Sequence, residues 1–400
     1  MIREGLHLGP ANAAPGVRDI PGLPARVIIN DCTLRDGEQA ANVNFSLEDK
    51  LRLARRLEAA GIPQLQVGYP GRSKADAELI RRLKGEGCRV PLEGLVLAYA
   101  EAWEAQIDAC VASGADWVKI IFVSSDLRLE HVFRLTRQEM QARSLAAIAR
   151  AKDQGARVNF SPADATRADI GFLTALVGKA VATGADRICI SDTLGSVFPR
   201  AMTYLMREVR RACRVPLVTH CHNDFGLALA NTLAAVEAGV EVVDCTLMGL
   251  GDRCGNAALE QVVLTLETFY GLDLGIRVGE LYDLCRFAAE VAGTQVPAAQ
   301  PLVGEHAFAH KLETHVQAIL AYPPAYESID PSVVGNRRRI VLGRYAGPAS
   351  LRARLRDLNL DFPDARLPEL LGAVEQLAVK NKSALTDDDL RLLVATQAAG

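Results

Sequence analysis

One junction occurs four times along the chain: AAGIPQLQV (59–67), ASGADWVKI (112–120), ATGADRICI (182–190) and EAGVEVVDC (237–245). Each copy ends a stretch of helical periodicity with small residues and a glycine, and an apolar run of strand type follows at once. Glycine just past a helix end supplies the left-handed backbone conformation that stops the helix. The four copies therefore predict a repeated passage from a helix into a strand.

Eight apolar runs of strand type are separated by amphipathic segments of helical periodicity, which predicts βαβ units and a parallel sheet. A unit of roughly 30 residues used eight times closes into a (β/α)8 TIM barrel, an α/β fold of about 250 residues. An open doubly wound sheet is the alternative, but no GxGxxG follows a strand to support it. The runs lie at 27–31, 64–68, 92–98, 117–123, 157–161, 187–191, 216–222 and 240–248.

The patterning predicts four regions. An N-terminal extension, 1–26, precedes the catalytic barrel, 27–272. The next stretch, 273–347, is rich in Pro, Gly, His and Tyr, and we expect it to be a linker or lid that contributes to the active site. Residues 348–400 carry helical patterns and predict a small C-terminal helical subdomain, in which Thr386 and Asp389 resemble a capping box.

Composition excludes several classes of protein. The 400 residues have a formal net charge of −3 and only 5% aromatics, whereas nucleic-acid binders usually show a strong basic excess. No run approaches the roughly 20 apolar residues of a membrane helix, and 1–26 lacks the apolar core of a signal peptide. Nine scattered cysteines without a CxxC pair indicate buried thiols in a reducing compartment. We expect a cytoplasmic protein that acts on small molecules and binds neither nucleic acid nor membranes.

Polar residues gather where the predicted strands end, which is the reactive face of a parallel barrel. His220 and His222 are two positions apart at the end of the seventh run, so their side chains point to the same side. Asp36 follows the first run. Two histidines and a carboxylate make a metal site with open positions for a substrate. The alternative is a pair of hydrogen-bonded histidines at the mouth of the barrel.

Other candidate residues admit two interpretations. Arg35, beside Asp36, could stabilise a developing oxyanion or form a salt bridge at the rim. Asn256 either lies near the metal or belongs only to the turn before the last barrel helix. His315 and Tyr326 lie in the irregular stretch after the barrel, where they could belong to a lid or to an ordinary surface.

Three motifs together resemble those of the acyl-CoA-condensing metal-dependent barrels, the family of homocitrate synthase, 2-isopropylmalate synthase and citramalate synthase. The segment 304–347 is similar to the linker of the homocitrate synthases. The resemblance covers about 25–350 and implies a barrel with helical subdomains, usually a homodimer whose linker crosses to the partner's active site. The motifs are DCTLRDGEQAANVNFSLEDK (31–50), HCHNDFGLALANTLAAVEAG (220–239) and GLGDRCGNAALEQVV (249–263).

The resemblance also implies a role for each matching residue. A divalent metal ion, Zn, Mn, Mg or Co, would be held by Asp36, His220 and His222, with Asn256 close by. Arg35 would hold the 2-oxo group and stabilise the alkoxide. The residues that match substrate contacts are Gln39, Ser161 and Thr193. The residues that match the acid–base pair of the linker are His315 and Tyr326. The implied reaction is a Claisen condensation of acetyl-CoA with a 2-oxo acid, which releases CoA and a 2-hydroxy di- or tricarboxylic acid.

The sequence departs from the homocitrate synthases at the acceptor side. Asn159 stands where they usually carry an arginine that anchors the distal carboxylate, and Gln66 and Ala163 stand where they usually carry glutamates. The base would then be His315 with another partner, for which Glu313 and Asp164 are candidates.

The acceptor is therefore open. The chain is homocitrate-synthase-like, and the lack of the extra regulatory domain usual in 2-isopropylmalate synthases favours this interpretation. The alternatives are phosphonopyruvate, giving 2-phosphonomethylmalate, and the acceptors of 2-isopropylmalate or citramalate synthase. A metal-dependent acyl-CoA lyase or aldolase is a more distant hypothesis, and a non-catalytic metabolite-binding barrel is a third.

Overall fold

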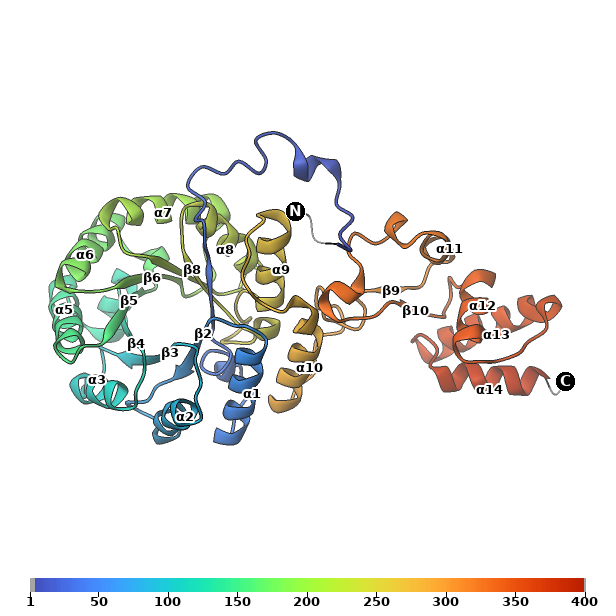
Figure 1. Ribbon diagram of the computed structural model, residues 1–400, viewed down its shortest axis with the longest axis horizontal. Coiled ribbons are helices and arrows are strands. Elements are labelled where there is room, and N and C mark those ends of the chain that lie inside the picture. Colours follow the sequence, from blue (N-terminus) through green and yellow to red (C-terminus); the bar gives the residue numbers. More distant parts are fainter. Residues whose placement is uncertain (1–3, 399–400) are drawn as a thin grey trace. The chain divides into compact units, whose positions relative to one another are not determined.

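The computed structural model describes residues 4–398, which form two compact units (Figure 1). The first unit is Ala11–Val296. The second consists of the described residues from Pro297 onward and of the segment that ends at Pro10.

The first unit is a closed barrel of eight parallel strands in sequential order, which confirms the predicted TIM barrel. β1 pairs with β8 over four residues and closes the sheet. The eighth strand is shorter than the predicted 240–248, because the chain leaves the sheet after Cys245 for a 3-10 turn in which Met248 has a φ of 58°. The strands are β1 Ile28–Asp31, β2 Gln64–Gly68, β3 Leu92–Leu97, β4 Trp117–Val123, β5 Arg157–Ala163, β6 Arg187–Asp192, β7 Leu217–Cys221 and β8 Val242–Cys245.

Helices surround the strands, as Figure 1 shows. The four repeated junctions behave as predicted, because Gly61, Gly114, Gly184 and Gly239 all have φ between 88° and 116°. The helices of this unit are α1 Leu47–Ala59, α2 Lys74–Gly85, α3 Trp103–Ala112, the short α4 Asp126–Arg128, α5 Arg137–Asp153, α6 Ile170–Thr183, α7 Pro199–Ala212, α8 Ala228–Glu237, α9 Leu259–Phe269 and α10 Leu281–Val291.

The barrel interior is polar, although barrels of this fold are usually filled by branched aliphatic side chains. Lys119 on β4 and Asp244 on β8 form an ion pair of 2.6 Å across the barrel, with side chains 2% and 0% exposed. Glu93 on β3 is fully buried as well and accepts hydrogen bonds from Asn30 on β1 and Asn159 on β5. These bonds join strands that are not neighbours in the sheet, so they cross-link the barrel from within.

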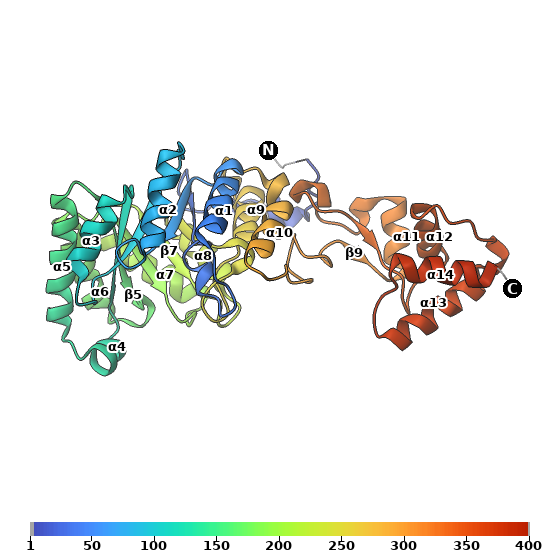
Figure 2. The same ribbon diagram turned by 90° about the horizontal axis from the view of Figure 1, so that it is seen from below.

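The second unit combines a short parallel ladder with a group of helices (Figure 2). β9 Ala309–His310 pairs with β10 Arg339–Ile340, and near the start of the chain Leu6 forms an antiparallel bridge with Ile329. Thr386 and Asp389 exchange the hydrogen bonds of the predicted capping box. The helices are α11 Glu313–Ala321, α12 Pro348–Asp357, α13 Leu367–Asn381 and α14 Asp387–Ala398, and the last three share one apolar core.

Two sequence expectations concern the chain as a whole. All nine cysteines are free thiols, and most of them are buried. Within residues 4–398, no helix has the length and apolar character required to cross a bilayer.

Gly255 lies in the loop after β8, close to the candidate site, and a substitution there tests how tightly this loop is packed. Its φ is 82°, and a Cβ there would lie 1.8 Å from the Gly249 carbonyl oxygen. We expect Gly255→Ala to lower the free energy of unfolding by about 3 kcal/mol, measured by urea denaturation. The matched control is Gly271→Ala, with a φ of 68° and nothing within 4 Å of the new Cβ, which should cost about 1 kcal/mol. If both substitutions lower the free energy of unfolding equally, the close approach of Gly255 to the Gly249 carbonyl does not determine the stability.

Candidate metal centre

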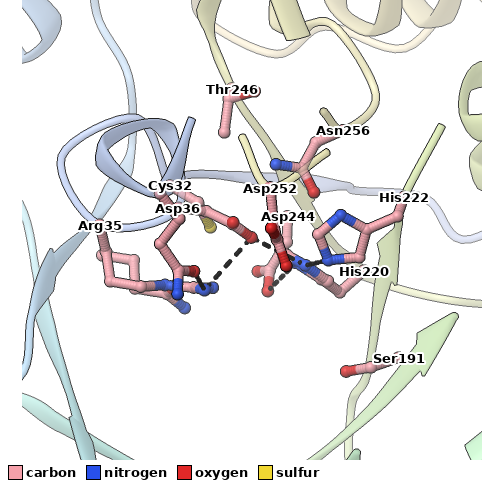
Figure 3. A network of polar contacts seen from close by, with 12 residues as sticks. Cys32, Arg35, Asp36, Ser191, His220, His222, Asp244, Thr246, Asp252 and Asn256 are labelled. Atoms are coloured by element: carbon pink, nitrogen blue, oxygen red, sulfur yellow. Dashed lines mark hydrogen bonds and ion pairs between the residues drawn. The ribbon is translucent and has the colours of Figure 1, made fainter. Parts of the chain in front are cut away.

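Three candidate ligands converge at the mouth of the barrel (Figure 3). Asp36 follows β1, His220 lies on β7 and His222 follows β7 by one residue. The Nε2 atoms of the two imidazoles are 3.2 Å apart, and His220 Nε2 is 3.0 Å from an Asp36 carboxylate oxygen. All three side chains are buried, so the structure brings together the three residues that the sequence singled out.

Neighbouring groups orient both imidazoles. His222 Nδ1 lies 3.2 Å from the Gly255 carbonyl oxygen, and His220 Nδ1 lies 3.3 Å from an Asp244 oxygen. With an acceptor beside each Nδ1, the Nε2 atoms face the shared space, where the lone pair of a neutral imidazole would meet a bound cation. This is the usual second layer of contacts behind metal-ligating histidines.

Electrostatics favours the metal-binding forms of Asp36 and His222, whereas Asp244 and Asp36 outweigh burial and raise the pKa of His220, so a bound cation would displace a proton from this imidazole. Burial opposes ionisation of Asp36, but Arg35 and His220 hold the pKa of its carboxyl well below the usual range. Burial and the charge of His220 lower the pKa of His222 to about 4, so this imidazole is neutral near pH 7. An ionised carboxylate and a neutral imidazole are the forms that ligate metals.

Unsatisfied acceptors show that a divalent cation fits this site. Neither oxygen of Asp36 accepts a hydrogen bond within the described chain, although Arg35 and His220 lie at ion-pair distance. The buried Oδ1 of Asn256 also has no hydrogen-bond partner among the described residues, while its Nδ2 donates to the Leu250 carbonyl. In Figure 3 that Oδ1 lies on the side of His222. Buried acceptors without donors are costly, and a cation would satisfy them.

Cys32, His220 and Asp244 form a second group with ligand spacing. Asp244 is already engaged, because it accepts from Lys119 at 2.6 Å and from Asn30 at 2.8 Å. Burial raises the pKa of the Cys32 thiol well above its usual value, so it stays protonated. Asp36, His220 and His222 are therefore the better candidate ligand set, and Asp244 contacts His220 Nδ1 beside it.

A continuous network of buried hydrogen bonds extends from the candidate metal site into the barrel interior. Asn30 Nδ2 donates to both Asp244 and Glu93, and Gln66 Nε2 donates to Glu93 at 2.6 Å. Lys119 and His220 hold the pKa of Asp244 low in spite of its burial, so the carboxylate stays ionised. We did not predict Lys119, Asp244 or Glu93 as site residues. The available signal was the presence of charged residues within three largely apolar strand runs.

Arg35 is fixed beside the ligands at the other end of this network. Its Nε donates to Gln66 Oε1 at 2.5 Å and its Nη1 to Gln39 Oε1 at 3.0 Å, while Asp36 lies 3.2 Å from Nη1. Burial lowers the pKa of Arg35, but Asp36 and its other neighbours outweigh this effect, so the guanidinium stays charged. Its Nη2 has no partner in the described chain and can donate to a bound anion.

The remaining barrel candidates lie on β5 and after β6. Ser161 Oγ is 3.2 Å from Ser191 Oγ, and Thr193 Oγ1 accepts from the Asp164 backbone at 2.8 Å. Asn159, at the position of the usual acceptor-anchoring arginine, donates to Glu93 at 2.7 Å. Its amide is thus bound inside the barrel and 1% exposed.

His315 and Tyr326 form a pair in the second unit. The Tyr326 hydroxyl is 2.7 Å from His315 Nε2, and the two rings are stacked with centroids 4.0 Å apart. The proposed partners of His315 are engaged elsewhere. Glu313 accepts hydrogen bonds at the start of α12, including one from Ser350 Oγ at 2.5 Å, and Asp164 binds Arg167 at 2.6 Å.

Comparison with known proteins supplies the family. The HMGL-like family matches residues 26–288, and the "Homocitrate synthase post-HMGL domain-like" family matches residues 302–382. The chain belongs to the HMGL-like family. It is 38% identical to "Homocitrate synthase AksA" of Methanopyrus kandleri over 93% of this chain and 92% of that protein. It is also 38% identical to "2-isopropylmalate synthase" of Methanocaldococcus jannaschii, over 93% of this chain and 72% of that protein.

The family membership confirms the resemblance and the expectation of an enzyme of the acyltransferase class. The solved structure of hydroxymethylglutaryl-CoA lyase from Pseudomonas aeruginosa has a TM-score of 0.59 with this HMGL-like chain. It covers 70% of this chain and 97% of the lyase at 23% identity, so this likeness shows the shared fold alone.

His220→Ala should lower the occupancy of a divalent metal, because it removes one of three ligands. Elemental analysis of the purified protein measures the bound metal per chain. His131→Ala, which changes an exposed histidine of the same unit, should leave the occupancy unchanged. Equal occupancy in the two variants would disprove the site.

Asp244→Asn should weaken metal affinity about 10–100-fold, because it replaces the carboxylate that orients His220. Asp76→Asn is the matched control, since Asp76 also forms a buried 2.7 Å ion pair with a lysine, Lys50, but does not contact a ligand. Affinity is measured by competition with a chelator on folded protein checked by circular dichroism. Similar losses in both variants would mean that Asp244 acts only on the fold.

Proposed function

We propose that this enzyme condenses acetyl-CoA with a 2-oxo acid and releases CoA and a 2-hydroxy di- or tricarboxylic acid. The carrying observation is the guanidinium of Arg35 beside the three-ligand set of Asp36, His220 and His222. The homocitrate and 2-isopropylmalate synthases to which the chain is 38% identical support this class of reaction.

The metal ligands and Arg35 would stabilise the acceptor's oxygen. A divalent ion held by Asp36, His220 and His222, with Asn256 as an additional oxygen, would supply Lewis-acid polarisation. Arg35 is held through its Nε and Nη1 atoms, which leaves Nη2 to donate to the oxyanion that develops on the 2-oxo carbon. Gln39, Ser161 and Thr193 would bind substrate around this centre. Zn, Mn, Mg and Co all suit the ligand set.

His315 and Tyr326 would carry out the acid–base steps. The methyl group of acetyl-CoA is a very weak acid, so a positioned base is required to remove a proton. The His315–Tyr326 pair is stacked, and Nε2 of the histidine is hydrogen-bonded to the tyrosine hydroxyl. We propose that the enzyme works as a homodimer, which sedimentation or light scattering would test.

The acceptor side differs from that of a homocitrate synthase. Asn159 cannot anchor a distal carboxylate as an arginine does, because its amide is engaged by Glu93. We therefore propose a homocitrate-synthase-like reaction with a modified acceptor pocket. Phosphonopyruvate, giving 2-phosphonomethylmalate, is the main alternative acceptor, followed by 2-oxoisovalerate and pyruvate.

The test is CoA thiol release from acetyl-CoA with a panel of 2-oxo acids: 2-oxoglutarate, 2-oxoisovalerate, pyruvate, oxaloacetate and phosphonopyruvate. We expect release to require one of these acceptors and to be lost in His220→Ala but not in His131→Ala. No release with any acceptor would overturn the proposal. Cleavage of a hydroxy-acyl-CoA without an acceptor would identify a lyase instead.

A further inference from the structure

The second unit contains a large basic hollow that the proposed function does not use. Its volume is about 980 Å³, and it lies among the β9–β10 ladder, α12, α13 and the start of α14. Seven Lys and Arg residues line it against three acidic residues, Glu305, Asp357 and Asp387. The whole chain has a net charge of −3, so this excess of four positive charges is a local concentration.

Several of these cations are not neutralised by the protein. Arg354 pairs with Asp357 and Asp387, and Arg338 pairs with Glu327. Three others have no carboxylate partner within the described chain: Lys311, Arg337 and Lys382. Like charges gathered in one hollow repel each other, and a bound anion would relieve this repulsion.

Lys311 packs on the wall of the hollow. A Cβ on Gly343 would lie 2.8 Å from Lys311 Cε, so the lysine stem packs directly on the glycine backbone. The Lys311 ammonium also lies 6.0 Å from the centre of the Tyr345 ring.

Apolar residues also line the hollow. Ile340, Leu342, Val379 and Leu385 line it, and the Leu385 backbone N–H donates to the Leu342 carbonyl at 3.0 Å. This bond ties the loop before α14 to the chain that follows β10. A ligand of this hollow can therefore contact apolar side chains as well as cations.

We propose that the hollow is a binding site for a small polyanionic ligand that carries phosphate groups on an apolar, nucleotide-sized body. At least three cations free of carboxylates require several negative charges on the ligand, which phosphate groups supply at neutral pH. Ligand pockets of about 300–1,000 Å³ hold a single small molecule, and the hollow lies at the upper end of this range.

Two sources share this chemistry. One is the nucleotide end of CoA, an interpretation that rests on the proposed function. The other is a free phosphate compound that binds independently of the reaction. The experiment distinguishes them with three probes, each titrated into the full chain by isothermal calorimetry: adenosine 3′,5′-bisphosphate, CoA and pyrophosphate.

We expect at least one probe to bind, and Lys311→Gln and Arg337→Gln each to weaken that binding about tenfold, because each removes a charged hydrogen-bond donor. Higher NaCl should weaken binding further. Arg391→Gln, an exposed cation of α14 outside the hollow, is the matched control and should leave affinity unchanged. Circular dichroism verifies that each variant is folded.

Every outcome discriminates. Binding of CoA and of the bisphosphate, both sensitive to Lys311 and Arg337, supports the nucleotide end of CoA as ligand. Binding of pyrophosphate alone with the same sensitivity supports a free phosphate compound. Absence of binding by all three probes, binding that neither Lys311→Gln nor Arg337→Gln weakens, or equal weakening by Arg391→Gln would overturn the proposal. Because no acceptor or turnover enters the titration, its failure differs from failure of the thiol-release test.

Discussion

The buried ion pair between Lys119 and Asp244 is the interaction on which the centre of the barrel depends. Both side chains are inside the barrel, away from water, where a lone charge would be very costly. Removing one partner of such a pair typically costs about 3–5 kcal/mol. The pair joins β4 to β8 across the interior, and Asp244 carries the effect onward to His220 and Asn30.

The polar residues inside the barrel contribute both to the fold and to the arrangement of the candidate site. From Asp244 the hydrogen bonds run through Asn30, Glu93 and Gln66 to Arg35, so the same network orients a candidate metal ligand and the guanidinium that we propose to stabilise the oxyanion. An aliphatic core would stabilise the barrel without orienting either group. The network also engages Asn159, whose amide donates to Glu93 inside the barrel.

Much of the fold could be predicted because the relevant signals are local. The junction glycines adopt the left-handed conformation expected from their place after a helix, and the spacing of His220 and His222 was sufficient to put both imidazoles on one side. The end of β8 was predicted three residues too late, because Thr246 and Met248 fit a strand pattern while the backbone turns away. Lys119 and Glu93 were overlooked, since their partners lie on distant strands.

The sequence by itself determined the barrel, the residues at its mouth and the family motifs, because periodicity, turn chemistry and short spacings are properties of neighbouring residues. Only the tertiary structure decided which charges meet. The pairing of Lys119 with Asp244, separated by 125 positions, and the gathering of Lys311, Arg337 and Lys382 around one hollow depend on chain closure. Electrostatic contacts act through space, so a local sequence pattern does not indicate which distant residue will pair with a charged side chain or whether any will.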